Sequence, residues 1–266
     1  MTRFFSVLIT IAFLLVETIS FPLSSLAATR TVTFDNREWN VKSGNYGPGP
    51  NFWTNDPSDV YVDEGGALHL TVVNHSGTWY SSEVWLPSSL GYGVYEFQID
   101  SDIASIDPNL IGAPFLYQDD THELDIEYTR WSDSTAPNTW YSIQPAYLKG
   151  HQTTYRTTTN GVGITARIEW TSDHVTFSTW QAGTILNSWT YAGSDNFVPG
   201  NERLHINFWQ NQGWEPLNGT RNEFVVKNFR FTQASSLLIT NPTTTTTIAP
   251  TTTKQKKVLS KKRRWR

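Results

Sequence analysis

Apolar and polar residues alternate in short runs through most of the chain between residues 31 and 232. In Gly93–Ile99 and in Thr165–Trp170, apolar residues recur at every second position, with Glu96 and Gln98 in the first segment and Arg167 and Glu169 in the second lying between them. A period of two is typical of a β-strand with one buried face. The pattern predicts strands at Thr31–Phe34, Ala67–Val73, Ser82–Leu86, Gly93–Ile99, Ile111–Tyr117, Glu123–Tyr128, Trp140–Ala146, Thr165–Trp170, His174–Trp180, Ile185–Tyr191, Arg203–Trp209 and Glu223–Phe231.

Turn-forming dipeptides separate these runs, among them Gly65-Gly66, Asn160-Gly161 and Asn218-Gly219. Such dipeptides favour the sharp reversals that connect neighbouring strands. No stretch shows the 3.6-residue period of an amphipathic helix. Many short alternating strands with frequent turns predict an all-β sandwich.

The first residues have the pattern of a secretory signal peptide. Arg3 precedes an apolar stretch at residues 4–16, which is short beside the ~20 residues that span a bilayer. Ser25-Leu26-Ala27 fits a small-residue cleavage site. We therefore expect residues 1–28 to be a signal peptide and the protein to be secreted, that is, extracellular or associated with the cell wall. The alternative is an uncleaved membrane anchor.

The other end of the chain changes composition after Ala234. Residues 235–253 are rich in Thr and Pro and predict an extended linker, because they cannot bury enough apolar surface to fold. Residues 254–266 hold eight Lys and Arg and no acid. They predict a basic disordered tail, which is either simply solvated or in electrostatic contact with an anionic wall polymer or membrane surface.

Charge and aromatic content narrow the partners. Of the 20 Lys and Arg, twelve precede the basic tail, whereas all 24 Asp and Glu do. The chain before the tail is therefore acidic, which argues against nucleic-acid binding. The 12 Trp exceed what a core requires, and their flat faces suit stacking on sugar rings. The chain has no Cys, which excludes disulfides and thiolate chemistry, so the core must hold the fold without covalent crosslinks.

The most informative residues are three acids that alternate with two apolar residues, in the order Glu123-Leu124-Asp125-Ile126-Glu127. On a strand the three carboxyls share one face and repel one another. A local cost of this kind is characteristic of functional sites. Glycosidases use two carboxyls, one as proton donor and one as nucleophile or base. The backbones of Glu123 and Glu127 would stand ~13 Å apart on a straight strand, so this role requires a concave sheet.

Two other interpretations of the acids stay open on the residue pattern alone. They could bind a cation, although calcium prefers loop oxygens, or they could form an exposed acidic strand. In a catalytic role, Asp125 would orient one Glu by a hydrogen bond, and its charge would raise that neighbour's pKa.

The run resembles the catalytic signature of glycoside hydrolase family 16. The resemblance spans most of residues 29–234 and implies a concanavalin-like β-sandwich jelly roll of two curved antiparallel sheets. In that family the first Glu is the nucleophile, the Asp assists and the last Glu is the acid/base. The resemblance thus implies these roles for Glu123, Asp125 and Glu127.

Further stretches resemble the family's substrate cleft. Ser82-Glu83 supplies a Glu that contacts substrate, Pro114-Phe115-Leu116-Tyr117 an aromatic strand, and Asn207-Phe208-Trp209 an Asn and a stacking Trp. Together with Trp residues in loops or beside polar residues, the predicted substrate-binding residues are Glu83, Phe115, Tyr117, Asn207, Trp209, Trp53, Trp131 and Trp214. His205 alternates with Asn207 and is placed to reach the cleft, whereas His122 should face away from Glu123.

The chain departs from the family pattern at four places, one of them Tyr128-Thr129-Arg130, where lichenases carry Phe-Leu-Gly. Thr121-His122 stands where lichenases carry Trp-Asp, Trp85 where they carry Arg, and Lys227 near the Asp that binds their structural calcium. We therefore predict no metal site and no cofactor. The motif has the form found in lichenases and xyloglucan transglycosylases, so mixed-linkage β-glucan is the first expectation, with laminarin, xyloglucan and marine galactans as alternatives.

These observations predict a secreted, monomeric endo-acting β-glycanase that hydrolyses β-glucan-type polysaccharide by a retaining double displacement. The alternatives are a non-catalytic lectin-like module, which binds carbohydrate without cutting it, and a cell-wall transglycosylase.

Overall fold

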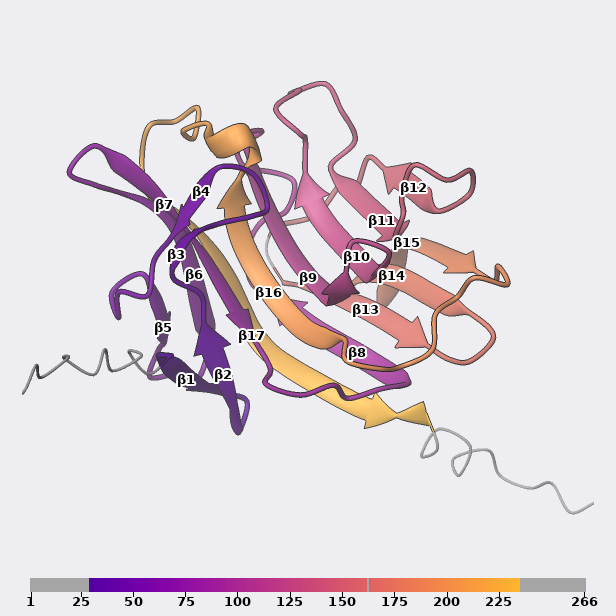
Figure 1. Ribbon diagram of the computed structural model, residues 1–266. Helices are drawn as coiled ribbons and strands as arrows, with labels where there is room; N and C mark the ends of the chain where they lie inside the picture. Colours follow the sequence, from indigo (N-terminus) through magenta and orange to yellow (C-terminus); the bar gives the residue numbers. More distant parts are fainter. Residues whose placement is uncertain (1–28, 162, 235–266) are drawn as a thin grey trace, which may run out of the picture.

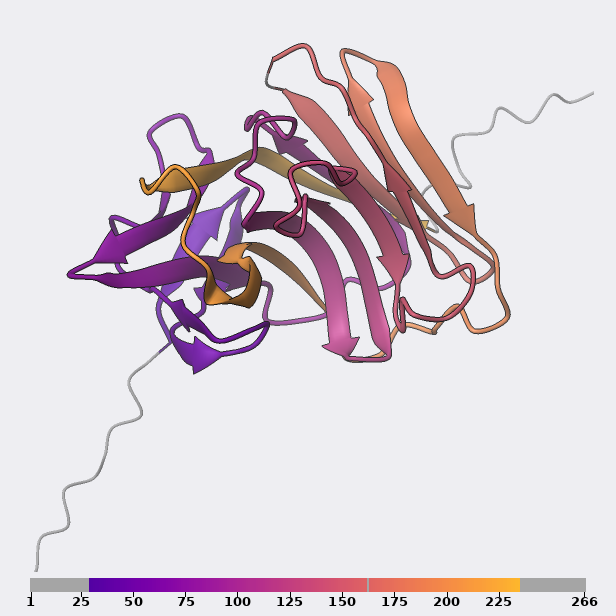
Figure 2. The same cartoon turned by 90° about the horizontal axis from the view of Figure 1, so that it is seen from above.

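The computed structural model describes residues 29–161 and 163–234. These residues form an all-β jelly-roll sandwich of two antiparallel sheets that pack face to face. Both sheets are strongly curved, as the long bent strands in Figure 1 and the view from above in Figure 2 show. The predicted fold class is confirmed.

The strands are short at the N-terminal edge and longest at the centre of each sheet. Their bounds are β1 (Thr31–Phe34), β2 (Arg37–Val41), β3 (Gly44–Tyr46), β4 (Asn51–Trp53), β5 (Val60–Val62), β6 (Leu68–His75), β7 (Thr78–Trp85), β8 (Gly93–Ile99), β9 (Leu110–Asp119), β10 (His122–Thr129), β11 (Thr139–Ile143), β12 (Gln152–Tyr155), β13 (Ile164–Trp170), β14 (Val175–Gln181), β15 (Thr184–Tyr191), β16 (Arg203–Gln210) and β17 (Asn222–Gln233), with a 3-10 turn, η1 (Asn211–Gly213).

The strands pair into an inner and an outer sheet. The inner, concave sheet runs β1–β2–β7–β16–β9–β10–β11–β12. The outer sheet runs β5–β6–β17–β8–β13–β14–β15. The β6–β7 hairpin joins the two sheets at one edge, where the short β4 adds to β7 in parallel. Strands distant in the sequence, such as β7, β9 and β16, are thereby brought side by side.

The alternation of residue types sorts side chains between the core and the two outer faces. On β10, Leu124 and Ile126 are fully buried between the sheets. The acids that alternate with them therefore point to the concave side. On β13, Ile168 and Trp170 enter the same core. Each large apolar side chain buried in this way contributes about 1.5–3 kcal/mol, which lets the sandwich hold without disulfides.

Most predicted strands are confirmed within one to three residues of their observed ends. The sequence pattern missed β2, β3, β4, β5 and β12. Four of these are three or four residues long, and β3 (Gly44–Tyr46) is wholly exposed, so no apolar alternation marks it. It forms by pairing with β4.

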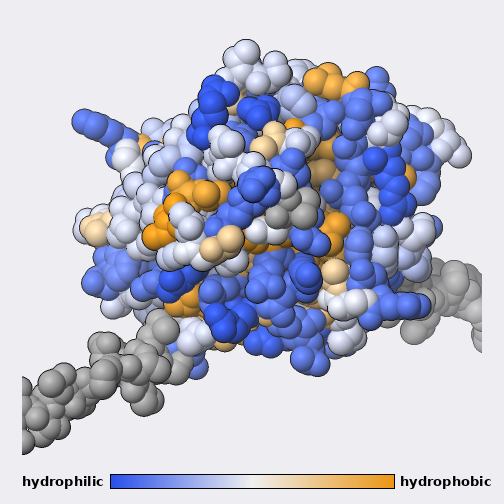
Figure 3. Space-filling view, turned by 180° about the vertical axis from the view of Figure 1, so that it is seen from behind, coloured by the Kyte–Doolittle hydropathy of each residue, from blue (hydrophilic) through white to orange (hydrophobic). Residues whose placement is uncertain are grey.

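The face behind that of Figure 1 is mostly hydrophilic, with small scattered apolar areas (Figure 3). Polar residues of the outer sheet project there, and Arg230 contacts Glu96 at 2.6 Å. Among the described residues, no helix is long and apolar enough to cross a membrane. The predicted signal peptide, linker and basic tail lie outside the described residues.

Gly112 allows β9 to pass close to an aromatic ring of the outer sheet. A Cβ at this position would lie 2.7 Å from two ring carbons of the buried Phe224. We predict that Gly112→Ala lowers the free energy of unfolding by about 1–3 kcal/mol through overpacking. Urea denaturation checks this. Gly47→Ala is the control, because its Cβ meets no atom within 4 Å, and equal midpoints for both variants would contradict the prediction.

Candidate active site

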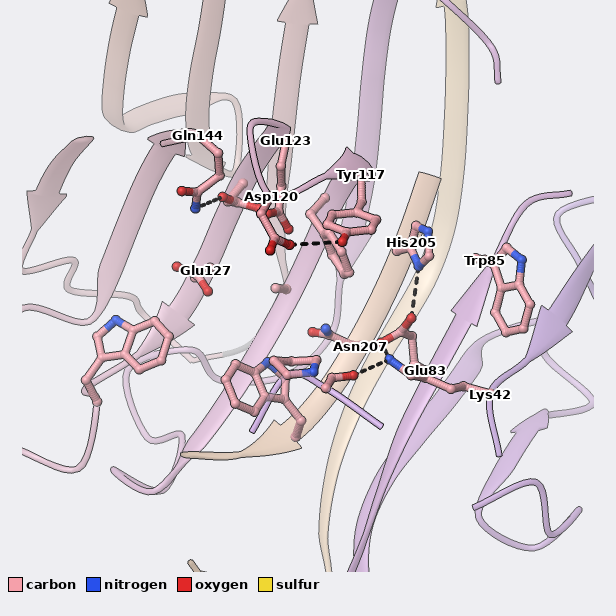
Figure 4. Close-up of a pocket in the computed structure, with 17 residues that line it drawn as sticks. Lys42, Glu83, Trp85, Tyr117, Asp120, Glu123, Glu127, Gln144, His205 and Asn207 are labelled. Carbon is pink, nitrogen blue, oxygen red and sulfur yellow. Dashed lines mark hydrogen bonds and ion pairs between the residues drawn. The ribbon is translucent and has the colours of Figure 1, made fainter. Parts of the chain in front are cut away.

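The concave sheet carries a cavity of about 650 Å³ that lies over β7, β16, β9 and β10. Figure 4 shows acidic side chains on one wall and a mixed Lys, Glu and His group on the other. The lining residues are Lys42, Gly47, Pro48, Glu83, Trp85, Ala113, Phe115, Tyr117, Asp120, Glu123, Asp125, Glu127, Trp131, Gln144, His205, Asn207 and Trp209.

Strand register assembles the cavity floor from distant parts of the chain. One row pairs Trp85 with His205, His205 with Phe115, and Phe115 with Asp125. The next row pairs Glu83 with Asn207 and Asn207 with Ala113. Residues paired across strands share a face, so the four central strands present one continuous surface.

The three acids of β10 all line this cavity. Asp125 is 4% exposed and accepts a hydrogen bond from Gln144 Nε2 at 3.1 Å. The backbone N–H of Ala146 donates to Gln144 Oε1 at 2.8 Å, so the Gln144 amide is held with its NH₂ toward Asp125. Gln144 therefore positions the middle acid of the triplet.

Burial raises the pKa of all three acids. It raises the pKa of Asp125 to about 7, against the opposing hydrogen bonds from Gln144 and Glu123. Burial, and then the charge of Asp125, hold the pKa of Glu123 and of Glu127 well above the ordinary value. Groups with pKa values in this range hold and release protons near neutral pH. Transfer of the Glu123 proton to Asp125 would leave a Glu123 carboxylate as nucleophile beside the proton donor Glu127.

The opposite wall is built around the buried carboxylate of Glu83. Lys42 Nζ lies 2.9 Å from Glu83 Oε2, and His205 Nδ1 lies 2.9 Å from Glu83 Oε1. Burial acts to raise the pKa of Glu83, but the hydrogen bond from His205 and the charge of Lys42 outweigh it and keep the pKa below the ordinary value. Glu83 is therefore ionised within a compact three-residue group.

Aromatic residues form the remaining walls. The rings of Trp131 and Trp209 meet edge to face with centroids 5.9 Å apart. Trp209 and Phe115 line the cavity and belong to a second, smaller apolar cluster, separate from the main core. This cluster stiffens the concave side of the inner sheet.

Two predicted substrate-binding residues lie elsewhere. Trp53 is 2% exposed and packs under the floor, where its Nε1 donates to the carbonyl of Tyr46 and the Lys42 ammonium lies 3.9 Å from its ring centroid. Trp214 is 54% exposed and lies just after η1, outside the cavity lining. The other predicted residues, Glu83, Phe115, Tyr117, Asn207, Trp209, Trp131, Glu123, Asp125 and Glu127, all line the cavity.

The lining residues that were not among the predicted site residues include the charged, polar and aromatic side chains of Lys42, Trp85, Asp120 and Gln144. Lys42 follows β2, a strand that was not predicted. Gln144 follows the last residue of β11, and only the pairing of β11 with β10 brings it to Asp125. Asp120 stands in the turn between β9 and β10, where it accepts a hydrogen bond from the Tyr117 hydroxyl at 3.1 Å.

The described residues contain no group of three or more His, Cys, Asp and Glu arranged to hold a metal ion. Lys227, at the position expected for a calcium ligand in similar proteins, is exposed and borders a cavity of about 210 Å³ with Asp100 and Gly163. Calcium requires several oxygen ligands, and an ammonium group repels it. The residues here do not fit a calcium site.

Comparison with known proteins shows the fold. No protein-family model and no curated protein matches the sequence. A β-1,3-glucanase from Mycobacterium marinum superposes with a TM-score of 0.58 and 20% identity, over 77% of this chain and 95% of that one. A β-glucanase from Bacillus licheniformis gives 0.56 and 15%, over 79% of this chain and 100% of the other.

A third similar structure is an immunostimulatory antigen and pseudo β-1,3-glucanase of Mycobacterium tuberculosis. Its TM-score is 0.59 and its identity 18%, over 77% of this chain and 98% of that one. The chain thus has the fold of family 16 β-glucanases, and at these identities the likeness extends to the fold alone.

The raised pKa of Asp125 makes stability depend on pH. Between about pH 4 and 7 the folded state binds more protons than the unfolded state, so the free energy of unfolding falls as pH rises. Asp125→Asn removes part of this pH-dependent loss. We predict that the free energy of unfolding of the variant, relative to that of the native protein, rises by at least about 1 kcal/mol from pH 4 to pH 8. Urea denaturation at both pH values measures it. Glu64→Gln, in an exposed turn, is the control, and a pH-independent difference for Asp125→Asn would contradict the prediction.

Proposed function

We propose that this protein is an exported endo-acting β-glycanase that cleaves β-glucan-type polysaccharide with retention of configuration. The observation that carries the proposal is the placement of Glu123, Asp125 and Glu127 on the floor of one cavity, with burial raising the pKa of each. Buried carboxyls beside stacking aromatics are the equipment that glycoside hydrolysis requires.

In the first step, a Glu123 carboxylate oxygen attacks the anomeric carbon as the bond to the leaving oxygen breaks. Glu127 gives its proton to that oxygen, so the departing chain leaves as an alcohol. In the second step, water attacks the covalent glycosyl ester, Glu127 takes the proton of the water, and Glu123 is released. Asp125, held by Gln144, accepts a hydrogen bond from Glu123 and takes the proton of Glu123 before the attack, so that Glu123 attacks as a carboxylate.

The extent of the cavity supports cleavage within a chain. Its lining runs from Lys42 after β2 and Trp85 at the end of β7, past the acids of β10, to Trp131 after β10, and Figure 4 shows the acids across the cavity from Lys42, Glu83 and His205. A glycan lying across the strands would contact sugar-binding surfaces on both sides of the acids. Export rests on residues 1–28, which have the pattern of a signal peptide.

A second candidate is a glycan-binding protein without catalysis. One structure of the same fold is described as a pseudo β-1,3-glucanase, so the fold alone does not guarantee hydrolysis. The three acids of β10, with their raised pKa values, favour the enzyme. A transglycosylase would use the same residues and differ only in the acceptor of the second step.

We predict that Glu123→Gln lowers the hydrolysis rate on mixed-linkage β-glucan and on laminarin by more than about 1,000-fold, because the amide cannot form the glycosyl ester. Release of reducing ends over a panel of glycans measures this, and circular dichroism verifies folding. Glu64→Gln is the matched control and should retain the native rate. A labelled oligosaccharide acceptor distinguishes transfer from hydrolysis.

Unchanged hydrolysis in Glu123→Gln would refute the assigned nucleophile. Glycan binding by the native protein with no bond cleavage on any member of the panel would favour the non-catalytic candidate.

A further inference from the structure

The wall opposite the acids contains a group that the proposed reaction does not use. Lys42, Glu83 and His205 interact through both oxygens of one carboxylate, and Glu83 is only 3% exposed. Because each oxygen already has a partner, Glu83 is poorly placed to bind a sugar itself. Its role is to hold Lys42 and His205 in fixed positions.

Lys42 is fully engaged in this arrangement. Besides Glu83, its ammonium donates to the carbonyl of Gly47 at 2.8 Å and lies over the ring of Trp53 at 3.9 Å. It therefore fastens the rim loop at Gly47 to the sheet, and its charge is cancelled by Glu83. The described cavity lining contains no Arg and no other Lys, so it offers no uncompensated Lys or Arg to a ligand.

Asn207 presents an unused acceptor beside this group. The residue is 3% exposed and lines the cavity, and its Oδ1 is buried without a hydrogen-bond partner among the described residues. A buried acceptor without a donor costs about 1–3 kcal/mol. A ligand hydroxyl that donates to Oδ1 removes that cost, whereas a ligand group that only accepts does not.

His205 provides a second polar atom for a ligand and part of a flat surface. Its Nδ1 faces Glu83, which leaves Nε2 with no partner in the described part of the chain. The imidazole stacks between Trp85, at 6.1 Å and 15°, and Phe115, at 4.9 Å and 30°. Nearly parallel rings of this kind offer an apolar face to a pyranose.

The facing wall is acidic. Asp120, Glu123 and Glu127 line it, and Figure 4 shows their carboxyl groups directed into the space that faces Glu83 and His205. An anionic group brought into this space is repelled by each of these carboxyls that ionises, and the described lining offers it no Lys or Arg other than Lys42, which is paired with Glu83.

We propose that the Trp85–His205–Asn207 end of the cavity is a subsite for a neutral, unsubstituted hexopyranose, and that it rejects sulfated or carboxylated sugar units. One hydroxyl group of the sugar donates to Asn207 Oδ1 and another forms a hydrogen bond with His205 Nε2, while the sugar face stacks on Trp85. This inference rests on the proposed function and narrows its substrate to neutral glucans, excluding sulfated galactans.

The test uses the full chain carrying Glu123→Gln, so that binding is measured without cleavage. Calorimetry compares a mixed-linkage β-glucan tetrasaccharide with the same tetrasaccharide oxidised to carboxylates at its C6 positions. We expect the neutral ligand to bind at least about tenfold more tightly, the equivalent of ~1.4 kcal/mol. Equal or tighter binding of the carboxylated ligand would overturn the subsite.

Three further variants locate the effect, each combined with Glu123→Gln. Trp85→Arg places a cation in the subsite and should reduce the preference for the neutral ligand by about fivefold or more, from charge attraction of ~1 kcal/mol. Trp214→Arg adds the same charge outside the cavity and should leave the preference unchanged. Asn207→Ala should weaken binding of the neutral ligand about tenfold through loss of the acceptor.

Equal effects of Trp85→Arg and Trp214→Arg, or full affinity in Asn207→Ala, would refute the assignment. The experiments distinguish failure of the glycanase proposal from failure of the subsite proposal. If the native protein hydrolyses neutral and carboxylated glucans equally well, the glycanase stands and the subsite falls. If the native protein hydrolyses no glycan while Glu123→Gln still binds the neutral ligand selectively, the subsite stands and the glycanase falls.

Discussion

The whole site depends on the burial of Leu124 and Ile126 between two sheets. Because side chains alternate along a strand, fixing these two residues in the core forces Glu123, Asp125 and Glu127 onto the concave face. A slip of one residue would bury three carboxyls in the core and expose two branched apolar residues. Core packing thereby maintains a carboxyl arrangement that electrostatic repulsion alone would disperse.

The carboxyl groups of the inner sheet lie in two different electrostatic environments. Around Asp125 the acids are buried together without a cation, so their pKa values rise and protons are retained near neutrality. Around Glu83 an ammonium and an imidazole surround one carboxylate, so its pKa falls and it stays ionised. Two carboxyl environments in one sheet, on β10 and on β7, thus take opposite roles: one holds protons for chemistry and the other holds the wall in place.

Much of this could be read from the sequence, and the limits have physical causes. The long alternating strands, the all-β sandwich and the shared face of the three acids follow from local periodicity, and the jelly roll follows from the resemblance to family 16. Lys42 and Gln144 were not predicted as site residues, because their contacts with Glu83 and Asp125 depend on cross-strand register, which a local sequence pattern does not contain. Trp53 was misplaced because a Trp beside a polar loop can turn beneath the floor when a backbone carbonyl accepts its N–H. Trp214 was misplaced because the chain turns away after η1.

The most direct test of the account is to trap the covalent intermediate. A glucan-type oligosaccharide with fluorine at C2 of the reacting sugar and a good leaving group slows hydrolysis of the glycosyl ester more than its formation. Peptide mapping by mass spectrometry after brief exposure should place one added glycosyl group on Glu123 in the native protein and none in Glu123→Gln. An adduct on another residue, or continued turnover of the unmodified glycan with no adduct at all, would contradict the account.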